Sequence, residues 1–288
     1  MSEKASILVQ LDTDPLPSVF DRVVAVDSGV QHVFSYGGVK PENVVPLVHG
    51  CIFTRGPKDL HRTAIFIGGS DVAAGEAVLA AVRAALQPFT VSVMLDSNGA
   101  NTTAAAAVRA AARHLDLSSA KSLVLGATGP VGQRVVLLLA RHGGHVRVGS
   151  RDPARAAKVC ARVRADMPQA KLEAVGVSSS TDGPAALDGR TLVVAAGAAG
   201  AVLLPKKVRS TCSTLRVAID LNGVPPAGIE GVDLFDAGTE RDGTVCYGAI
   251  GIGNTKMKLH RAAVAKLFTA NHLVLDATEI YDLAVQLP

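Results

Sequence analysis

The run from Lys121 to Arg155, KSLVLGATGPVGQRVVLLLARHGGHVRVGSRDPAR, constrains the fold of this 288-residue chain more than any other stretch. A short apolar strand leads into a turn that contains Gly126, Gly129 and Gly132, and an apolar-faced helix follows. In such a turn one glycine allows the tight bend, one lets the backbone approach a pyrophosphate, and one lets the helix pack closely on the strand. Free N–H groups at the helix N-terminus then face the phosphates. The run therefore predicts a dinucleotide-binding domain.

The second strand of this unit ends in Gly149-Ser150-Arg151. An NAD site usually has an acidic residue here, about 20 residues after the first glycine, which accepts hydrogen bonds from the ribose. No acidic residue occurs from Leu117 to Arg151. An arginine fork binds a 2′-phosphate through paired charge-assisted hydrogen bonds, whereas a carboxylate repels it. We therefore predict NADP rather than NAD as the cofactor.

The glycines are spaced G-x-x-G-x-x-G, so the prediction depends on the whole order of strand, turn, helix, strand and arginine. Gly197 and Asn222 follow two later strands, and a ligand lies beyond the carboxyl ends of parallel strands. The alternatives are a turn that binds nothing and, around Gly197, an ordinary flexible loop. The predicted cofactor-binding residues are Gly126, Thr128, Gly129, Pro130, Val131, Gly132, Ser150, Arg151, Gly197 and Asn222.

Composition narrows the class of protein. Hydrophobic residues make up 48% of the chain and charged residues 19%, as in a well-buried globular enzyme. The net charge of +4 comes without a run of Lys or Arg, which argues against nucleic acid as a partner. Four widely spaced cysteines fit neither a zinc ribbon nor a disulfide framework, and the aliphatic runs are too short for a membrane span. We expect a cytoplasmic protein without a signal peptide or a metal, and a homo-oligomer.

Strands alternate with helices in both halves of the chain, which predicts two α/β domains with mainly parallel sheets and a substrate cleft between them. We expect a discontinuous catalytic domain at 1–115 and 255–288, and a Rossmann-like NADP-binding domain at 116–254. Within these, Pro41 is expected to open a short helix, Asn101-Thr102-Thr103 to cap a long one, and the glycines from Tyr247 to Gly253 to form a turn. Further predicted elements are strands at Ser6–Leu11, His32–Tyr36, Thr63–Ile67 and Thr90–Leu95, and helices capped by Ser18, by Ser70-Asp71 and by Asp276 with Glu279.

Polar clusters follow three predicted strands of the first domain. They contain Asp14 after the first strand, Ser70-Asp71 after a later one, and Asp96 with Asn98 after the next. Parallel strands bring such ends to one edge of a sheet, and carboxylates and amides suit a ring with several N–H donors and a carbonyl, such as a pterin. Taken singly, each Asp is more often a helix cap or turn former than a ligand.

Four basic residues, Lys256, Lys258, His260 and Arg261, crowd the start of the helix behind Gly251 and Gly253. At least two of them are expected to form a solvated basic face. One lysine is expected to face the cleft and to be partly desolvated.

Seven sequence segments, spread over both predicted domains, resemble one known family. The chain resembles the bacterial NAD(P)-dependent methylene-tetrahydromethanopterin and methylene-tetrahydrofolate dehydrogenases. The matching segments are LDTDPLPSVFD at Leu11, TAIFIGGSDVAAGE at Thr63, MLDSNGANTTAAA at Met94, GATGPVG at Gly126, PPAGIEGVD at Pro225, GAIGIGNTKMKLHRAAVAKLF at Gly248 and EIYDLA at Glu279.

The resemblance implies reversible oxidation of the methylene group between N5 and N10 of a reduced pterin to a methenyl cation, with hydride passing to the nicotinamide. It places Lys256 in the lysine-bearing segment of the family, as a catalytic residue that orients or polarises substrate. The predicted substrate-binding residues are Asp14, Asp96, Asn98 and Lys256. Two alternatives remain, a non-catalytic NADPH-binding sensor and a bifunctional dehydrogenase/cyclohydrolase.

Overall fold

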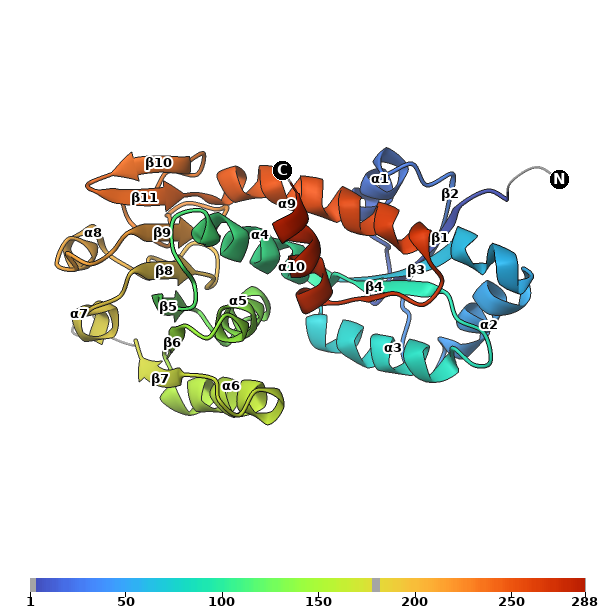
Figure 1. Cartoon of the computed structure of the whole chain (residues 1–288), viewed down its shortest axis with the longest axis horizontal. Helices are drawn as coiled ribbons and strands as arrows, with labels where there is room; N and C mark the ends of the chain where they lie inside the picture. Colours follow the sequence, from blue (N-terminus) through green and yellow to red (C-terminus); the bar gives the residue numbers. More distant parts are fainter. Residues whose placement is uncertain (1–3, 178–181, 288) are drawn as a thin grey trace. The chain divides into compact units, whose positions relative to one another are not determined.

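The computed structural model describes residues 4–177 and 182–287. The chain forms two compact units (Figure 1). The first unit contains the chain up to Thr102 and again from Met257 onward, and the second unit is Thr103–Lys256. Two helices, α4 (Ala100–Ala112) and α9 (Ala249–Lys266), contribute residues to both units. The chain therefore passes between the units within helices, not within loops.

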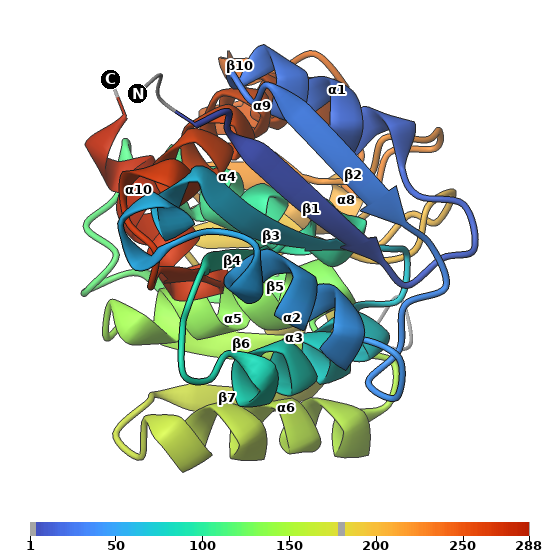
Figure 2. The same ribbon diagram turned by 90° about the vertical axis from the view of Figure 1, so that its right-hand side faces the viewer.

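The first unit is built on a parallel sheet with the strand order β12-β4-β3-β1-β2. Helices α2 and α3 cover one face, where they pack on alternate residues of β1, β3 and β4. Helices α1 and α9 lie on the other face (Figure 2). The strands are β1 (Ile7–Asp12), β2 (His32–Tyr36), β3 (Thr63–Gly68), β4 (Ser92–Leu95) and β12 (Val274–Leu275). The helices are α1 (Val19–Asp27), α2 (Val45–Phe53), α3 (Val72–Ala85) and α10 (Ala277–Gln286).

Local capping explains where several of these helices begin. Ser18 accepts a hydrogen bond from the Asp21 N–H, and Asp71 accepts from the N–H groups of the first turn of α3. Asp276 and Glu279 form a complete capping box at α10. These side chains satisfy N–H groups that have no partner within the helix. The three predicted caps are confirmed.

The second unit contains a larger sheet with the order β10-β11-β9-β8-β5-β6-β7. Only β10 in this sheet of the described chain is antiparallel to its neighbour. Counted from β5, the parallel strands run 3-2-1-4-5-6, the order of a Rossmann fold, and the switch point lies between β5 and β8. The strands are β5 (Lys121–Leu125), β6 (His145–Ser150), β7 (Leu172–Gly176), β8 (Leu192–Ala195), β9 (Val217–Asp220), β10 (Ala237–Arg241) and β11 (Thr244–Tyr247). The helices are α5 (Pro130–Arg141), α6 (Pro153–Asp166), α7 (Asp182–Leu187) and α8 (Lys206–Arg209). The predicted fold class, two mainly parallel α/β sheets with the second Rossmann-like, is confirmed.

Three local predictions were wrong. Pro41 lies in a turn, and α2 begins only at Val45. Helix α4 begins at Ala100, before the expected cap at Asn101. Two of the three glycines expected to form a turn, Gly251 and Gly253, lie inside α9, where a side chain at Gly251 would overlap the backbone of Asp236. Close packing, not a bend, requires glycine at that position.

No helix within residues 4–177 and 182–287 is both long and apolar enough to cross a bilayer.

Candidate functional site

The glycine turn between β5 and α5 leaves no room for side chains at two of its three glycines. Gly126 has a φ of +69°, in the left-handed region that favours glycine, and a Cβ there would overlap the backbone of Gly197. A Cβ on Gly132 would overlap the Gly126 carbonyl and lie 2.8 Å from the Ala127 Cα. At Gly129 a Cβ would make ordinary contacts, the nearest at 3.4 Å. The protein itself therefore requires Gly126 and Gly132, whereas the open side of Gly129 is the place where a ligand can approach.

The first turn of α5 presents unused donors beside this turn. Gly129 is the N-cap, Pro130 has no N–H, and the helix has no side-chain cap. The Gln133 side chain donates to the Thr128 carbonyl (2.9 Å) and holds the loop in place. The N–H groups of Val131 and Gly132 make no hydrogen bond within the described ranges. Such a helix N-terminus favours phosphate, so the cradle fits a dinucleotide.

The end of β6 carries one exposed arginine. The side chain of Arg151 makes no ion pair or hydrogen bond with residues 4–177 and 182–287. Asp152 beside it is used as the N-cap of α6, where it accepts from the Ala154 N–H (2.9 Å). Arg147 is held by Glu173 (2.9 Å) within the sheet. Arg151 is thus the predicted cation whose position and exposure suit a 2′-phosphate.

The loops after β8 and β9 complete the carboxyl edge of this sheet. Gly197 lies against Gly126, as the turn geometry requires. The Asn222 amide donates to the Pro226 carbonyl (3.0 Å), and its oxygen accepts from the Val224 N–H (3.1 Å). Asn222 therefore shapes its own loop, which borders a small pocket of about 160 Å³. Buried Asp220 closes the base of this loop, and burial raises the pKa of its carboxyl group.

In the first unit, side-chain and backbone hydrogen bonds join the loops after three neighbouring strands. Both carboxylate oxygens of Asp14 accept from Ser70, one from the N–H (2.9 Å) and one from the hydroxyl (2.8 Å). The Asn98 N–H donates to the Gly69 carbonyl (2.7 Å). Asn98 is exposed and has a φ of +54°, a conformation that asparagine tolerates better than most residues. The predicted strand-end clusters lie together at one edge of this sheet.

Asp96 has a different environment from Asp14 and Asn98, the other two predicted substrate residues at strand ends. Its side chain is 2% exposed, and it accepts hydrogen bonds from the N–H groups of Asn101 (2.9 Å) and Thr102 (3.0 Å) and from the Thr102 hydroxyl. It is the true cap of α4. The structure shows that the carboxylate oxygens of Asp96 are buried and already accept hydrogen bonds, and its role in substrate binding stays a prediction.

Lys256 lies on α9 and is half-buried, whereas its neighbours Lys258 and Arg261 are exposed. His260 follows it by one helical turn, so the two side chains share a face of α9. Of the four basic residues in this segment, Lys256 and His260 thus lie on the protected side and the other two in solvent.

Comparison with known proteins decides the family. The chain is 44% identical over 292 aligned residues to the "Bifunctional protein MdtA" of Methylorubrum extorquens, and the match covers 100% of both chains. It is 32% identical to the NAD(P)-dependent methylenetetrahydromethanopterin dehydrogenase of the same organism, with 98% of both chains covered. The chain belongs to this dehydrogenase family.

A family model supports this membership, and two solved structures share the fold. Residues 19–98 match the family model described as methylene-tetrahydromethanopterin dehydrogenase, N-terminal. Among solved structures, the quinate dehydrogenase of Corynebacterium glutamicum in complex with NAD superposes with a TM-score of 0.54, 14% identity and coverage of 99% of this chain and 100% of that chain. The 5-ketofructose reductase of Gluconobacter sp. strain CHM43 gives 0.54, 15% identity and 99% of both chains. At these identities the structures support the fold alone.

The sequence placed His260 in the basic segment of helix α9, but its burial was not predicted. His260 is 1% exposed, stacks on Phe66 with ring centroids 5.6 Å apart, and has its Nδ1 4.0 Å from the Asp96 carboxylate. Burial raises the pKa of Asp21 to about 6; His260 opposes this shift, and the nearby carboxylates of Asp96 and Asp12 add to it. The signal was present in the helical spacing, because apolar residues occur one position before His260 and three, four and seven positions after it.

Proposed function

We propose that this chain is an NADP-dependent dehydrogenase that removes hydride from the methylene group of 5,10-methylene-tetrahydromethanopterin or 5,10-methylene-tetrahydrofolate and reversibly forms the methenyl product. The whole-length identity of 44% to a curated relative carries the proposal. The dinucleotide cradle of the second unit and the polar strand ends of the first unit supply the two kinds of binding group that the reaction needs.

In this proposal the glycine turn and the start of α5 hold the pyrophosphate. Gly126 and Gly132 keep the turn compact, and the N–H groups of Val131 and Gly132 donate to phosphate oxygens. Thr128, Gly129 and Pro130 form the wall of the turn, and Ser150 supports the strand end that carries Arg151. The bound nicotinamide supplies the hydride acceptor.

Arg151 is proposed to select NADP. Its exposure and its lack of a protein partner in the described chain leave its guanidinium available for a bidentate contact with the 2′-phosphate. Asp152, the nearest carboxylate in sequence, is used as a helix cap and is not available to bind an NAD ribose. Gly197 and Asn222 are proposed to lie near the nicotinamide end, Gly197 through its backbone and Asn222 through the shape of its loop.

For the pterin, we propose Asp14 and Asn98 as ring contacts and Lys256 as the catalytic residue. Carboxylate and amide groups match the N–H donors and the carbonyl of such a ring. Hydride leaves with the help of the ring nitrogens, so the reaction needs no general base on the carbon. The residues act by holding the donor carbon about 3 to 3.5 Å from the acceptor. Lys256 therefore orients or polarises the substrate.

Steady-state kinetics with both methylene-pterins and with NADP and NAD tests the proposal directly. We expect NADP-dependent formation of the methenyl product with at least one pterin, and a clear preference for NADP. Inactivity with both pterins would show that the function is different. Binding of NADPH without any effect of a pterin would instead favour a sensor.

The name of one relative, "Bifunctional protein MdtA", gives a second candidate function a specific basis. A dehydrogenase/cyclohydrolase would hydrolyse the methenyl product to a formyl-pterin. We expect none, because hydride transfer needs only positioning while hydrolysis needs an activated water. Release of formyl-pterin from purified methenyl-pterin decides between the two.

We also propose that the protein is cytoplasmic and homo-oligomeric. Helix α1 exposes four large apolar side chains, and such a patch on a folded protein marks a contact surface. They are Val19 (64% exposed), Phe20 (51%), Val23 (53%) and Val26 (60%). Light scattering on the purified chain tests the prediction, and a monomeric mass at micromolar concentration would contradict it.

A further inference from the structure

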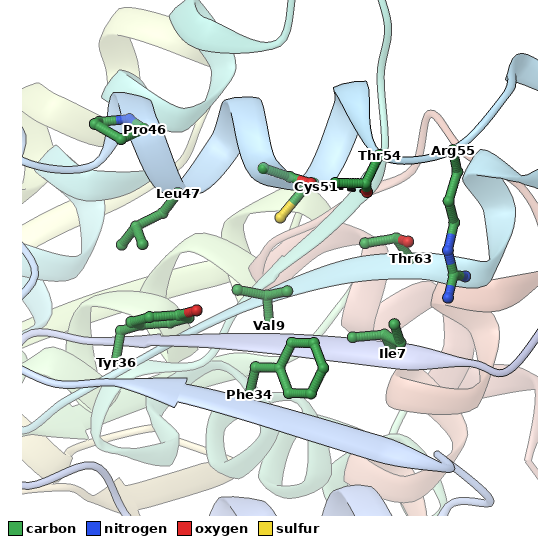
Figure 3. A pocket seen from close by; sticks show the side chains of 11 residues that line it. Ile7, Val9, Phe34, Tyr36, Pro46, Leu47, Cys51, Thr54, Arg55 and Thr63 are labelled. Carbon is green, nitrogen blue, oxygen red and sulfur yellow. Dashed lines mark hydrogen bonds between the residues drawn. The ribbon is translucent and has the colours of Figure 1, made fainter.

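The first unit contains a pocket of about 390 Å³ between helix α2 and the strands below it (Figure 3). The pocket opens where α2 packs over β1 and β3 but does not cover the same face of the edge strand β2. Phe34 and Tyr36 of β2 remain 47% and 42% exposed, although they lie on the same face of the sheet as buried Val9. This volume lies within the range of pockets that bind small molecules.

Apolar side chains line most of the pocket. Val9 and Phe34 form the sheet side, and Leu47 projects from α2 above them (Figure 3). Gly50 of the same helix leaves the space open, because a Cβ built on it would meet no atom within 4 Å. The pocket therefore has room for a flat ring or a short aliphatic chain.

One end of the pocket is polar. Thr63 is 3% exposed, and its hydroxyl has no hydrogen-bond partner in residues 4–177 and 182–287. A buried polar group without a partner destabilises the fold, so such groups are rare in folded proteins. Thr63 lines the pocket beside Arg55, as Figure 3 shows. The unsatisfied hydroxyl therefore indicates that a ligand atom, and not a protein atom, is its hydrogen-bond partner.

Arg55 makes the same end positively charged. Its guanidinium donates to the Arg62 carbonyl (2.7 Å), which fixes it beside Thr63. Burial, followed by the charge of Arg62, lowers the pKa of Arg55, and Asp59 opposes this shift. Cys51 adds no negative charge, because burial raises the pKa of its thiol to about 12. An anion at this end would offset two neighbouring positive charges.

We propose that this pocket binds a small organic acid with an apolar body, whose carboxylate contacts the Arg55 guanidinium and the Thr63 hydroxyl and whose body lies between Leu47 and Phe34. The charged end, the unsatisfied hydroxyl and the apolar walls each match one part of such a ligand. Ile7 and Thr63 begin their strands, whereas the proposed pterin contacts follow strand ends, so this site is independent of the proposed reaction.

Isothermal titration calorimetry of the full chain with 4-phenylbutyrate tests this site, with 4-phenylbutan-1-ol as the neutral probe. We expect the acid to bind at least about tenfold more tightly than the alcohol, as a charge-assisted hydrogen bond predicts. Arg55→Gln should remove this preference. Lys58→Gln, an exposed neighbour outside the pocket, removes the same charge and should leave it unchanged.

Two further variants separate the pocket from general effects on folding. Gly50→Leu should fill the cavity and abolish binding of the acid without loss of stability, because it replaces glycine within a helix. Thr63→Val should weaken binding while leaving the free protein as stable as before or more stable, since it removes an unsatisfied hydroxyl. Retention of the wild-type affinity by either variant would overturn the assignment.

Two further outcomes would also overturn it. The first is equal binding of acid and alcohol, or no binding of the acid. The second is a smaller assembly mass for Gly50→Leu than for wild type in light scattering, which would show that a second copy of the chain covers this face.

Discussion

The second unit builds its candidate site from backbone, and the first unit builds its own from side chains. Both sites follow the carboxyl ends of parallel strands. At Gly126 and Gly132 the absence of a side chain is what the geometry demands. The three polar residues at the strand ends of the first unit differ in their environments. Asp14 links two loops, Asp96 is buried and caps a helix, and Asn98 is exposed to solvent. Spacing alone reveals the first kind of site, whereas the second kind requires knowledge of burial.

Gly132→Ala tests the backbone-built site with the largest expected effect. The new Cβ would overlap the Gly126 carbonyl, and no rotamer change relieves an overlap with backbone. We expect NADP affinity to fall about 100-fold or more, which corresponds to about 3 kcal/mol. Fluorescence titration with NADPH measures this. Gly50→Ala, in a helix where the Cβ meets nothing within 4 Å, is the control and should bind NADPH normally. Equal NADPH affinities of Gly132→Ala and wild type would mean that the backbone of the turn shifts enough to accommodate the new methyl group.

Asp21→Asn tests the first unit, whose candidate site is built from side chains, through the dependence of its stability on pH. The folded-state pKa of about 6 lies above the ordinary 3.8, so the folded protein holds this proton more tightly than the unfolded chain does. Stability should therefore fall as pH rises from about 4 to about 6, by at most about 3 kcal/mol, and stay low above that window. The variant should be more stable than wild type at pH 7 and less dependent on pH.

Urea denaturation from pH 4.5 to pH 7.5 checks this expectation. Asp27→Asn, at an exposed position on the same helix, is the control and should leave the pH dependence of wild type intact. Parallel curves for wild type and Asp21→Asn would show that Asp21 titrates normally.

Arg151→Asp tests the one proposed side-chain contact of the second unit, which lies beside a site otherwise built from backbone. We expect NADP affinity to fall about 30-fold, the loss of roughly 2 kcal/mol of charge-assisted hydrogen bonding, while NAD affinity changes little. Arg216→Asp is the control, because Arg216 is exposed at the opposite end of the strands. A similar loss for both cofactors would remove Arg151 from the phosphate site.

Lys256→Ala has the smallest expected effect of the four. Turnover should fall about tenfold with NADP affinity nearly intact, because a single charged contact to the substrate is worth about 1.4 kcal/mol or more. Lys258→Ala, two residues further along α9 and exposed, should retain full turnover. If both variants behave alike, the segment is a solvated basic face and the catalytic prediction for Lys256 fails.

The sequence predicted those features that depend on neighbours in the chain. The turn at Gly126 and the caps at Ser18, Asp71 and Asp276 are local, so their residues are readable in order. The cap of α4 was misassigned, because Asp96 reaches forward by five and six residues from the end of a strand. The glycines of α9 were mistaken for a turn, since the reason for Gly251 is the backbone of distant Asp236.

His260 shows the same limit in the first unit. Its place in an apolar helical pattern predicts burial, but only the fold brings Phe66 and Asp96 against it. The unpaired hydroxyl of Thr63 was equally invisible, because its lack of a partner is a property of the surrounding space and not of the residue.

The pairing of β12 with β4 determines the order in which this chain can be completed during synthesis. Val274 pairs with Val93, so one edge of the first sheet stays open until β12, which follows the whole second unit in the chain, leaves the ribosome. The second unit is continuous and needs no such delay. Nascent chains that stop after Lys256 should therefore protect the Rossmann sheet from proteases while β4 remains an uncovered edge, the kind of edge that invites aggregation. The first sheet is thus completed only after the whole second unit has been translated, and until then the open edge of β4 is the place where a chaperone would bind.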